Sequence, residues 1–326
     1  MRLSGRALAM CRTFASVCFL TALGVQAQQG YPNRPVRIIN PLAPGGTTDI
    51  TARTLAPQLS TLLGQPVVVE NRTGAGGVVG AEYVAKSVPD GYTLLLMSGD
   101  SYNTNAALYP KLPFDARKDL QPVALLAASP NMLSVHPSLP VKSVKELVAL
   151  SKTRPKELNY GVGGTAGLIR MEMLKLDTGL MITNVPYKGS GPALVDLMAG
   201  HIHAGFFNSV ATIPYVLSGR LRGLMISGMK RSERLPNVPT GRELGLSGFD
   251  ENAAYMIMVP SATPPDVIAR LNKELVRALQ TPELKSRFAA EGAEIIGSSH
   301  EEAVARQNRE IAEWAALIKR TGIKLN

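Results

Sequence analysis

Short apolar runs of strand length alternate with segments of helical periodicity along most of this 326-residue chain. Apolar runs bounded by turn residues are typical of strands, and apolar residues at three- and four-residue spacing are typical of helices. Their alternation favours an α/β fold. We expect strands at 36–40, 66–71, 93–98, 123–127, 132–135, 159–162, 182–185, 204–208, 223–227 and 254–259. Ten strands are many for one sheet.

The expected helices lie between and after these strands. The first carries Ala52, Leu55 and Leu59 at helical spacing, and Pro57 within it should kink or fray it. Further helices are expected at 144–152, 168–177, 193–199, 213–217, 265–279, 282–291 and 300–319.

The first 27 residues differ in composition from the rest of the chain. They hold three Arg and no acidic residue, then an apolar run at 13–25 and a small-x-small sequence that ends at Ala27. This pattern is typical of a secretory signal peptide, and the run is too short for a convincing membrane span. We expect cleavage after about Ala27, with a buried N-terminal helix as the alternative.

Loss of this leader limits the chemistry of the mature chain. Both cysteines, Cys11 and Cys18, lie within it, so no thiol nucleophile, disulfide or thiolate metal site remains. Loss of three Arg lowers the formal net charge from +10 to +7. The remaining Lys and Arg are scattered without aromatic interleaving, which argues against a nucleic-acid partner.

Two short junctions divide the sequence. Strand-like runs follow the segments 128–131 and 248–251. A chain that leaves one lobe near residue 128 and returns near residue 252 builds two lobes with a cleft between them. We expect lobe 1 to comprise residues 28–128 and 253–326, and lobe 2 residues 129–252.

Two glycine-rich turns, each between a predicted strand and a predicted helix, are the best candidates for a binding site. They run through residues 40–49 and 160–167. The unpaired N–H groups and the dipole of a helix N-terminus favour an anion there. Each turn alone is as well explained by plain helix capping, but one turn in each lobe can close on a shared ligand. Asp49 does not suit an anion, and should cap the helix, hold the loop or meet a donor on the ligand.

Other chemistries have little support in the sequence. The glycine cluster at 74–80 superficially resembles a dinucleotide-binding loop. No acidic residue closes a second strand about 20 residues further on, as such a site needs, so we expect a packing turn. His201 and His203 would share a strand face but have no further ligand nearby, so we expect exposed strand-end histidines and no metal. Residues 227–230 match Ser-x-x-Lys, but no Ser-Asp-Asn or Lys-Thr-Gly accompanies them and the chain has no nucleophile elbow, so we expect neither catalysis nor a cofactor.

Aromatic residues make up only 5% of the chain, which disfavours a sugar site built on aromatic faces. Trp314 is expected to pack in the last helix. Tyr187 and Tyr255 are expected in the core, with a pocket wall as the alternative. Arg170 is expected on an exposed helix face, with a ligand contact as the alternative.

A series of ordered motifs resembles a known family. These are YPNRPVR at 31–37, PGGTTD at 44–49, GQPVVVENR at 64–72, GAGG at 74–77, PDGYTL at 89–94, VPYKG at 185–189, LPNVPT at 235–240 and TP at 263–264. Together they resemble the Bug receptors, the periplasmic substrate-binding proteins of tripartite tricarboxylate transporters, over essentially the whole mature chain. The resemblance implies a type II periplasmic-binding-protein fold, with two α/β lobes and a Venus-flytrap cleft, that works in the periplasm without catalysis.

The resemblance also implies a ligand and its site. The ligand is a small organic carboxylate: a di- or tricarboxylate, an acidic amino acid or an aromatic acid. It is held by the loops after two strands, one per lobe, which here are residues 43–49 and 161–166. The residues expected to bind it are Ala43, Pro44, Gly45, Gly46, Thr47, Asp49, Ser98, Gly163, Gly164, Thr165, Ala166, Asn184 and Asn208. Family members often carry His where Leu168 and Asn184 stand and Trp where Tyr255 stands, so no single member's ligand transfers to this chain.

The expected partners follow from the same resemblance. The receptor would deliver its ligand to the membrane subunits of a transporter. Signalling to a two-component sensor kinase through the same cleft is the alternative. We expect a monomer, with no nucleic acid and no stable membrane insertion of the mature chain.

Overall fold

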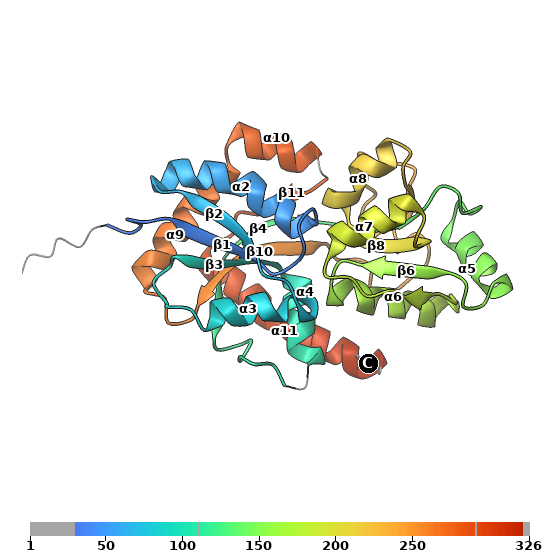
Figure 1. Ribbon diagram of the computed structural model, residues 1–326, viewed down its shortest axis with the longest axis horizontal. Helices are drawn as coiled ribbons and strands as arrows, with labels where there is room; N and C mark the ends of the chain where they lie inside the picture. Colours follow the sequence, from blue (N-terminus) through green and yellow to red (C-terminus); the bar gives the residue numbers. More distant parts are fainter. Residues whose placement is uncertain (1–29, 110, 291, 322–326) are drawn as a thin grey trace, which may run out of the picture. The chain divides into compact units, whose positions relative to one another are not determined.

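Two separate β-sheets form the framework of the protein (Figure 1). The computed structural model describes residues 30–109, 111–290 and 292–321. The first sheet has the strand order β11-β4-β10-β3-β1-β2, and the second has the order β7-β6-β8-β5-β9. The strands of the first sheet are β1 (Val36–Asn40), β2 (Val67–Asn71), β3 (Thr93–Ser98), β4 (Leu120–Ser129), β10 (Ala253–Pro260) and β11 (Glu294–Ile295). Those of the second are β5 (Asn131–Val135), β6 (Asn159–Val162), β7 (Thr183–Asn184), β8 (Ala204–Asn208) and β9 (Arg222–Ile226).

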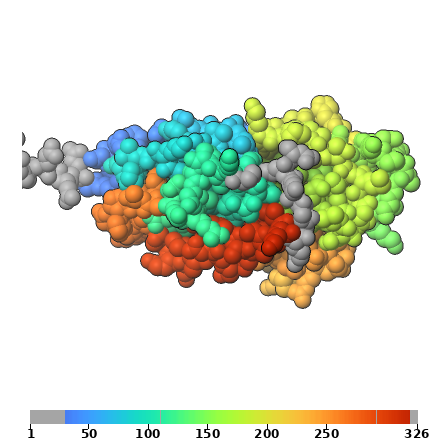
Figure 2. All heavy atoms as spheres, turned by 90° about the horizontal axis from the view of Figure 1, so that it is seen from below, coloured from blue at the N-terminus to red at the C-terminus, as the bar shows by residue number. Residues whose placement is uncertain are grey.

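Helices cover both faces of each sheet. They are α2 (Thr47–Leu63), α3 (Val78–Ala85) after the 3-10 turn η1 (Ala75–Gly77), α4 (Gly99–Leu108), α5 (Val144–Thr153), α6 (Thr165–Thr178), α7 (Ser190–Ala199), α8 (Ser209–Leu217), α9 (Pro265–Leu279), α10 (Pro282–Ala290) and α11 (His300–Thr321). Figure 1 shows α2 and α10 on one side of the first sheet and α3, α4 and α11 on the other. Helix α11 lies against α4, and both are visible on the face in Figure 2.

The parallel pairs of strands determine where the helices begin. β1 pairs in parallel with β2 and β3, and β6 pairs in parallel with β7 and β8. The carboxyl ends of parallel strands lie at one edge of their sheet. Helices α2, α4, α6 and α8 therefore begin at these edges, because they follow β1, β3, β6 and β8 directly.

The chain passes between the sheets at two adjacent places. Pro130 alone separates β4 from β5, and β10 begins the return at Ala253. Ala253 pairs with Ser129, so the two crossings lie side by side. The first sheet takes its strands from residues 36–129 and 253–295, and the second from 131–226. The lobe boundaries given above stay a prediction. The signal peptide expected at residues 1–27 lies outside the described residues.

Each sheet is stabilised by a buried apolar core. Leu95, Met97 and Met256 belong to the core of the first sheet, and Leu133 and Phe206 to that of the second. All of these side chains are at most 1% exposed. Burial of this kind is the main favourable contribution to folding.

The predicted α/β class is confirmed, and all ten predicted strands are present, with ends moved by at most three residues. The short strand β11 and helices α3 and α4 were not expected. Helix α2 runs on through Pro57 to Leu63. The helix begins at Thr47, directly after the glycine turn.

Candidate ligand-binding site

A small polar cavity lies at the carboxyl ends of parallel strands from both sheets. Its volume is about 50 Å³. Its walls are Leu42, Gly46, Thr47, Thr48, Ser98, Asp100, Ser101, Asn131, Gly163, Gly164, Ala166, Gly167, Ser190, Phe206, Phe207, Asn208, Ala253 and Tyr255. In open α/β sheets, ligands bind outside the carboxyl ends of the strands. A larger hollow of about 930 Å³ lies by the amino-terminal ends of β1 and β3. Position therefore favours the smaller cavity.

Four helices begin at this cavity without a side-chain cap. Their N-cap residues are Gly46 for α2, Ser98 for α4, Gly164 for α6 and Gly189 for α7, and none makes a capping side-chain hydrogen bond. The first N–H groups of a helix have no partner within the helix, and the helix dipole is positive at that end. An anion in the cavity would therefore meet several sets of N–H groups at once. By contrast, the side chain of Asn208 caps α8 by accepting from the Val210 N–H.

Thr48 adds a hydroxyl to this wall. Its residue is only 3% exposed, and its Oγ1 has no hydrogen-bond partner among the described residues. A buried hydroxyl without a partner is destabilising by about 1–3 kcal/mol. The wall thus offers a donor that a bound molecule can satisfy.

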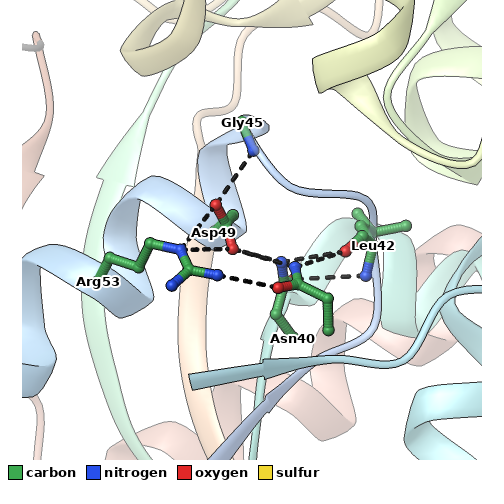
Figure 3. A network of polar contacts seen from close by, with 6 residues as sticks. Asn40, Leu42, Gly45, Asp49 and Arg53 are labelled. Carbon is green, nitrogen blue, oxygen red and sulfur yellow. Dashed lines mark hydrogen bonds and ion pairs between the residues drawn. The ribbon is translucent and has the colours of Figure 1, made fainter. Parts of the chain in front are cut away.

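Asp49 holds in place the glycine turn after β1, residues 40–49 (Figure 3). Its carboxylate accepts from the Gly45 N–H at 3.0 Å, from Arg53 Nε at 3.0 and 3.1 Å, and from Asn71 Nδ2 at 3.0 Å. The Asn40 side chain bonds both the N–H and the carbonyl of Leu42. Of the three roles considered for Asp49, its contacts within the structure support that of holding the loop.

The ionisation of Asp49 gives a pH prediction. Burial opposes its charge, but the hydrogen bonds from Arg53, Gly45 and Asn71 prevail and hold its pKa below the ordinary value of 3.8. A lowered pKa stabilises the fold fully above pH 3.8, and that contribution is lost as pH falls through the folded-state pKa. Asp49→Asn is expected to lower the free energy of unfolding at pH 7 by about 1–3 kcal/mol.

The measurement is urea unfolding at pH 7, 5 and 3. The difference between Asp49→Asn and the unsubstituted protein should shrink at the lowest pH, where the wild-type carboxylate begins to protonate. Glu233→Gln, at an exposed position, is the control and should change little. Equal stability of Asp49→Asn and wild type at pH 7 would contradict the structural role.

The glycine turn after β6, residues 161–166, packs closely against the starts of α7 and α4. A Cβ atom on Gly163 would lie 2.0 Å from Ser190 Oγ, and one on Gly164 would lie 3.0 Å from Ser101 Oγ. The Thr165 hydroxyl donates to Asn105 Oδ1 at 2.7 Å. A side chain at either glycine would require the neighbouring serine hydroxyl to move, and Thr165 ties the start of α6 to α4.

Arg170 forms a buried ion pair with Asp100, so its predicted exposure was wrong. Arg170 Nη2 lies 2.9 Å from Asp100 Oδ2, and the two side chains are 3% and 5% exposed. The Arg170 guanidinium also lies 5.5 Å from the centre of the Trp314 ring. Arg170 is covered because α6 packs against α4, a helix that was not predicted.

Seven of the thirteen expected site residues line the cavity. They are Gly46, Thr47, Ser98, Gly163, Gly164, Ala166 and Asn208. The other six lie outside its lining: Ala43, Pro44, Gly45, Asp49, Thr165 and Asn184. Of these, Ala43 donates its N–H to the Lys188 carbonyl at 3.1 Å. Asn184 lies on the short edge strand β7. Ligand contact by all thirteen stays a prediction.

Several lining residues were not expected. Asp100 and Ser101 belong to the first turn of α4, Ser190 begins α7, and Asn131 lies where the chain crosses between sheets. Tyr255 is buried, and it also lines the cavity, which is the pocket-wall position given above as its alternative. Burial, with the nearby charge of Asp100, raises its pKa, so its hydroxyl stays protonated.

The remaining sequence expectations have mixed outcomes. Trp314 packs against Ile169 and Met173, as expected. His201 and His203 precede β8 and do not share a strand face, since His201 contacts Asp196 and His203 contacts Asn159. The glycines at 74–80 form a packed turn, in which a Cβ on residue 80 would lie 2.7 Å from Pro41 Cβ.

Within residues 30–321, apart from 110 and 291, no helix combines the length and apolar character that a bilayer span requires. The same residues contain no cluster of three or more acidic, His or Cys side chains placed to hold a metal ion.

The sequence and the fold were compared with known proteins. Residues 51–323 match the family described as Tripartite tricarboxylate transporter family receptor. Protein BugT of Bordetella pertussis is 39% identical over 313 residues, covering 94% of this chain and 96% of that protein. An R. palustris protein solved with adipate is 36% identical with a TM-score of 0.85, covering 90% of this chain and 99% of that chain. MatC from Rhodopseudomonas palustris, with bound malate, is 31% identical with a TM-score of 0.84, covering 88% and 100%.

Proposed function

Because the chain belongs to the tripartite tricarboxylate transporter receptors, a family of periplasmic binding proteins and not of enzymes, we propose that its cavity binds a small organic carboxylate for transport. The observation that carries this proposal is the set of four helices that begin at the cavity without side-chain caps. Their N–H groups and dipoles suit a carboxylate. The adipate and malate in the two R. palustris structures support the same class of ligand.

The finer parts of the proposal concern where the protein acts and with what. The chain is exported to the periplasm, with a signal peptide removed after about Ala27. The mature protein acts as a monomer and hands its ligand to the membrane subunits of a tripartite transporter. Mass spectrometry of the protein recovered from the periplasm would test the cleavage site directly.

The ligand test uses the mature chain, residues 28–326. Thermal unfolding is measured with mono-, di- and tricarboxylates, amino acids, aromatic acids and neutral sugars. A ligand that binds only the folded state raises the melting temperature by an amount that grows with its concentration. We expect a shift with one class of acid and none with sugars. A shift only with sugars would overturn the proposal.

The site is tested by placing larger side chains in its two glycine turns. Gly46→Leu and Gly164→Leu place bulk at the starts of α2 and α6, where both glycines line the cavity, and a Cβ on Gly46 already lies 3.4 Å from Ser190 Cβ. Each variant is expected to weaken binding of the best acid at least about tenfold, a change of roughly 1.4 kcal/mol. Val88→Leu, at a position 68% exposed, is the control. Unchanged affinity in both loop variants would show that the site lies elsewhere.

A further inference from the structure

Asp100 is the one charged side chain among the described residues that line the cavity. It is only 5% exposed and stands in the first turn of α4. An acidic side chain is unexpected in the wall of a site for an anion, because like charges repel strongly where water is excluded. Its presence therefore needs a chemical reason.

Arg170 approaches Asp100 from α6, and Arg170 is not a cavity-lining residue. It contacts Oδ2 at 2.9 Å. A carboxylate has about four lone-pair sites, so one hydrogen bond leaves capacity for further donors. Asp100 therefore presents acceptor capacity to the cavity while Arg170 balances its charge.

The position of Asp100 also divides the cavity into unlike parts. A carboxylate in the first turn of α4 interacts favourably with that helix's own dipole. The starts of α2, α6 and α7 carry no acidic residue in their first turn that lines the cavity, since Asp49 of α2 is turned to Arg53 and Asn71. These three helix starts remain for the ligand's anion.

We propose that Asp100 determines the ligand class within the proposed function, on which this inference rests: the ligand is a compact carboxylic acid that also carries a hydroxyl or ammonium group next to the carboxylate. The donor group hydrogen-bonds Asp100 while the carboxylate meets the starts of α2, α6 and α7. An unsubstituted acid offers no donor to the acceptor sites that Arg170 leaves free on Asp100. A second carboxylate beside Asp100 is repelled.

The first experiment needs no variant. Binding to the mature wild-type protein is measured by calorimetry for two matched sets, succinate with malate and aspartate, and propionate with lactate and alanine. We expect the hydroxy or amino acid of at least one set to bind ten times more tightly than its unsubstituted parent, and the two arms distinguish hydroxyl from ammonium. If the unsubstituted acid binds as tightly in every set that binds, the inference is wrong. If none of the six acids binds but another acid raises the melting temperature in the wider panel, the inference is wrong and the proposed function stands; if no acid in the wider panel raises it either, the proposed function fails as well.

The second experiment changes the residue. Asp100→Asn is expected to reduce the preference for the substituted acid to less than threefold, with circular dichroism confirming the fold. Because Asp100→Asn leaves Arg170 buried without its ion partner, the double variant Asp100→Asn, Arg170→Met is measured as well. Asp250→Asn, at an exposed position, is the control and should keep the preference. A preference retained in folded Asp100 variants would overturn the assignment.

Discussion

Replacing Arg170 with alanine is expected to lower the free energy of unfolding by about 3–5 kcal/mol, the effect of removing one partner from a buried ion pair. Its partner Asp100 is 5% exposed and would be left as an uncompensated buried charge. A second buried acid, Glu310, lies close by, and burial together with the charge of Asp100 raises its pKa. Without Arg170, repulsion between the two acids would have less to offset it.

Urea unfolding at pH 7 measures this loss. Arg309→Ala is a matched control, because Arg309 is 63% exposed and pairs with Glu313 on the surface at 3.6 Å. Exposed pairs of this kind contribute about 0–1 kcal/mol. The double variant Asp100→Asn, Arg170→Met should recover much of the lost stability, since it removes the unpaired charge as well. Similar losses for Arg170→Ala and Arg309→Ala would show that the buried pair does not stabilise the fold.

The Arg170–Asp100 pair also shows which features could not be predicted from the sequence. The two glycine turns could be predicted because their signals are local: a strand, then Gly and Thr, then helical periodicity. Helix α4 has no such signal, because its sequence GDSYNTNAAL is rich in residues of low helix propensity. It is helical because it is buried against α6 and α11, segments far away in the chain.

Failure to predict α4 explains most of what was missed at the site. Asp100 and Ser101 belong to its first turn, so neither could be assigned to the cavity wall. The burial of Arg170 was missed for the same reason. A single Arg on a helix is usually exposed, and the packing of α4 against α6 buries this one. The family itself was predictable, because its motifs are short and local, and the comparisons confirm it.

A methyl group at Gly191 is expected to weaken ligand binding by roughly 100-fold while the protein stays folded. A Cβ on Gly191 would lie 2.0 Å from the Pro44 carbonyl oxygen, far inside contact distance. The backbone of residue 191 fixes the position of its Cβ, and the oxygen belongs to the Pro44 backbone, so no side-chain rotation relieves the overlap. Overpacking of this kind destabilises the packed arrangement by about 1–3 kcal/mol, and 1.4 kcal/mol is tenfold in Kd.

The loss should appear in binding and not in folding. Gly191 lies within α7, where alanine has the higher helix propensity, so the helix itself is not harmed. The overlap is with the loop after β1, a strand of the other sheet. We therefore expect α7 and this loop to move apart, which opens the cavity and leaves both sheets folded. Calorimetry with the best acid and urea unfolding are measured on the same sample. The control is Val195→Ala, at a position on the same helix that is 60% exposed.

Unchanged affinity for Gly191→Ala would mean that the ligand binds without contact between α7 and the loop after β1. Weak binding with an intact unfolding free energy would instead show that closure of the loop on α7 is part of the ligand's affinity.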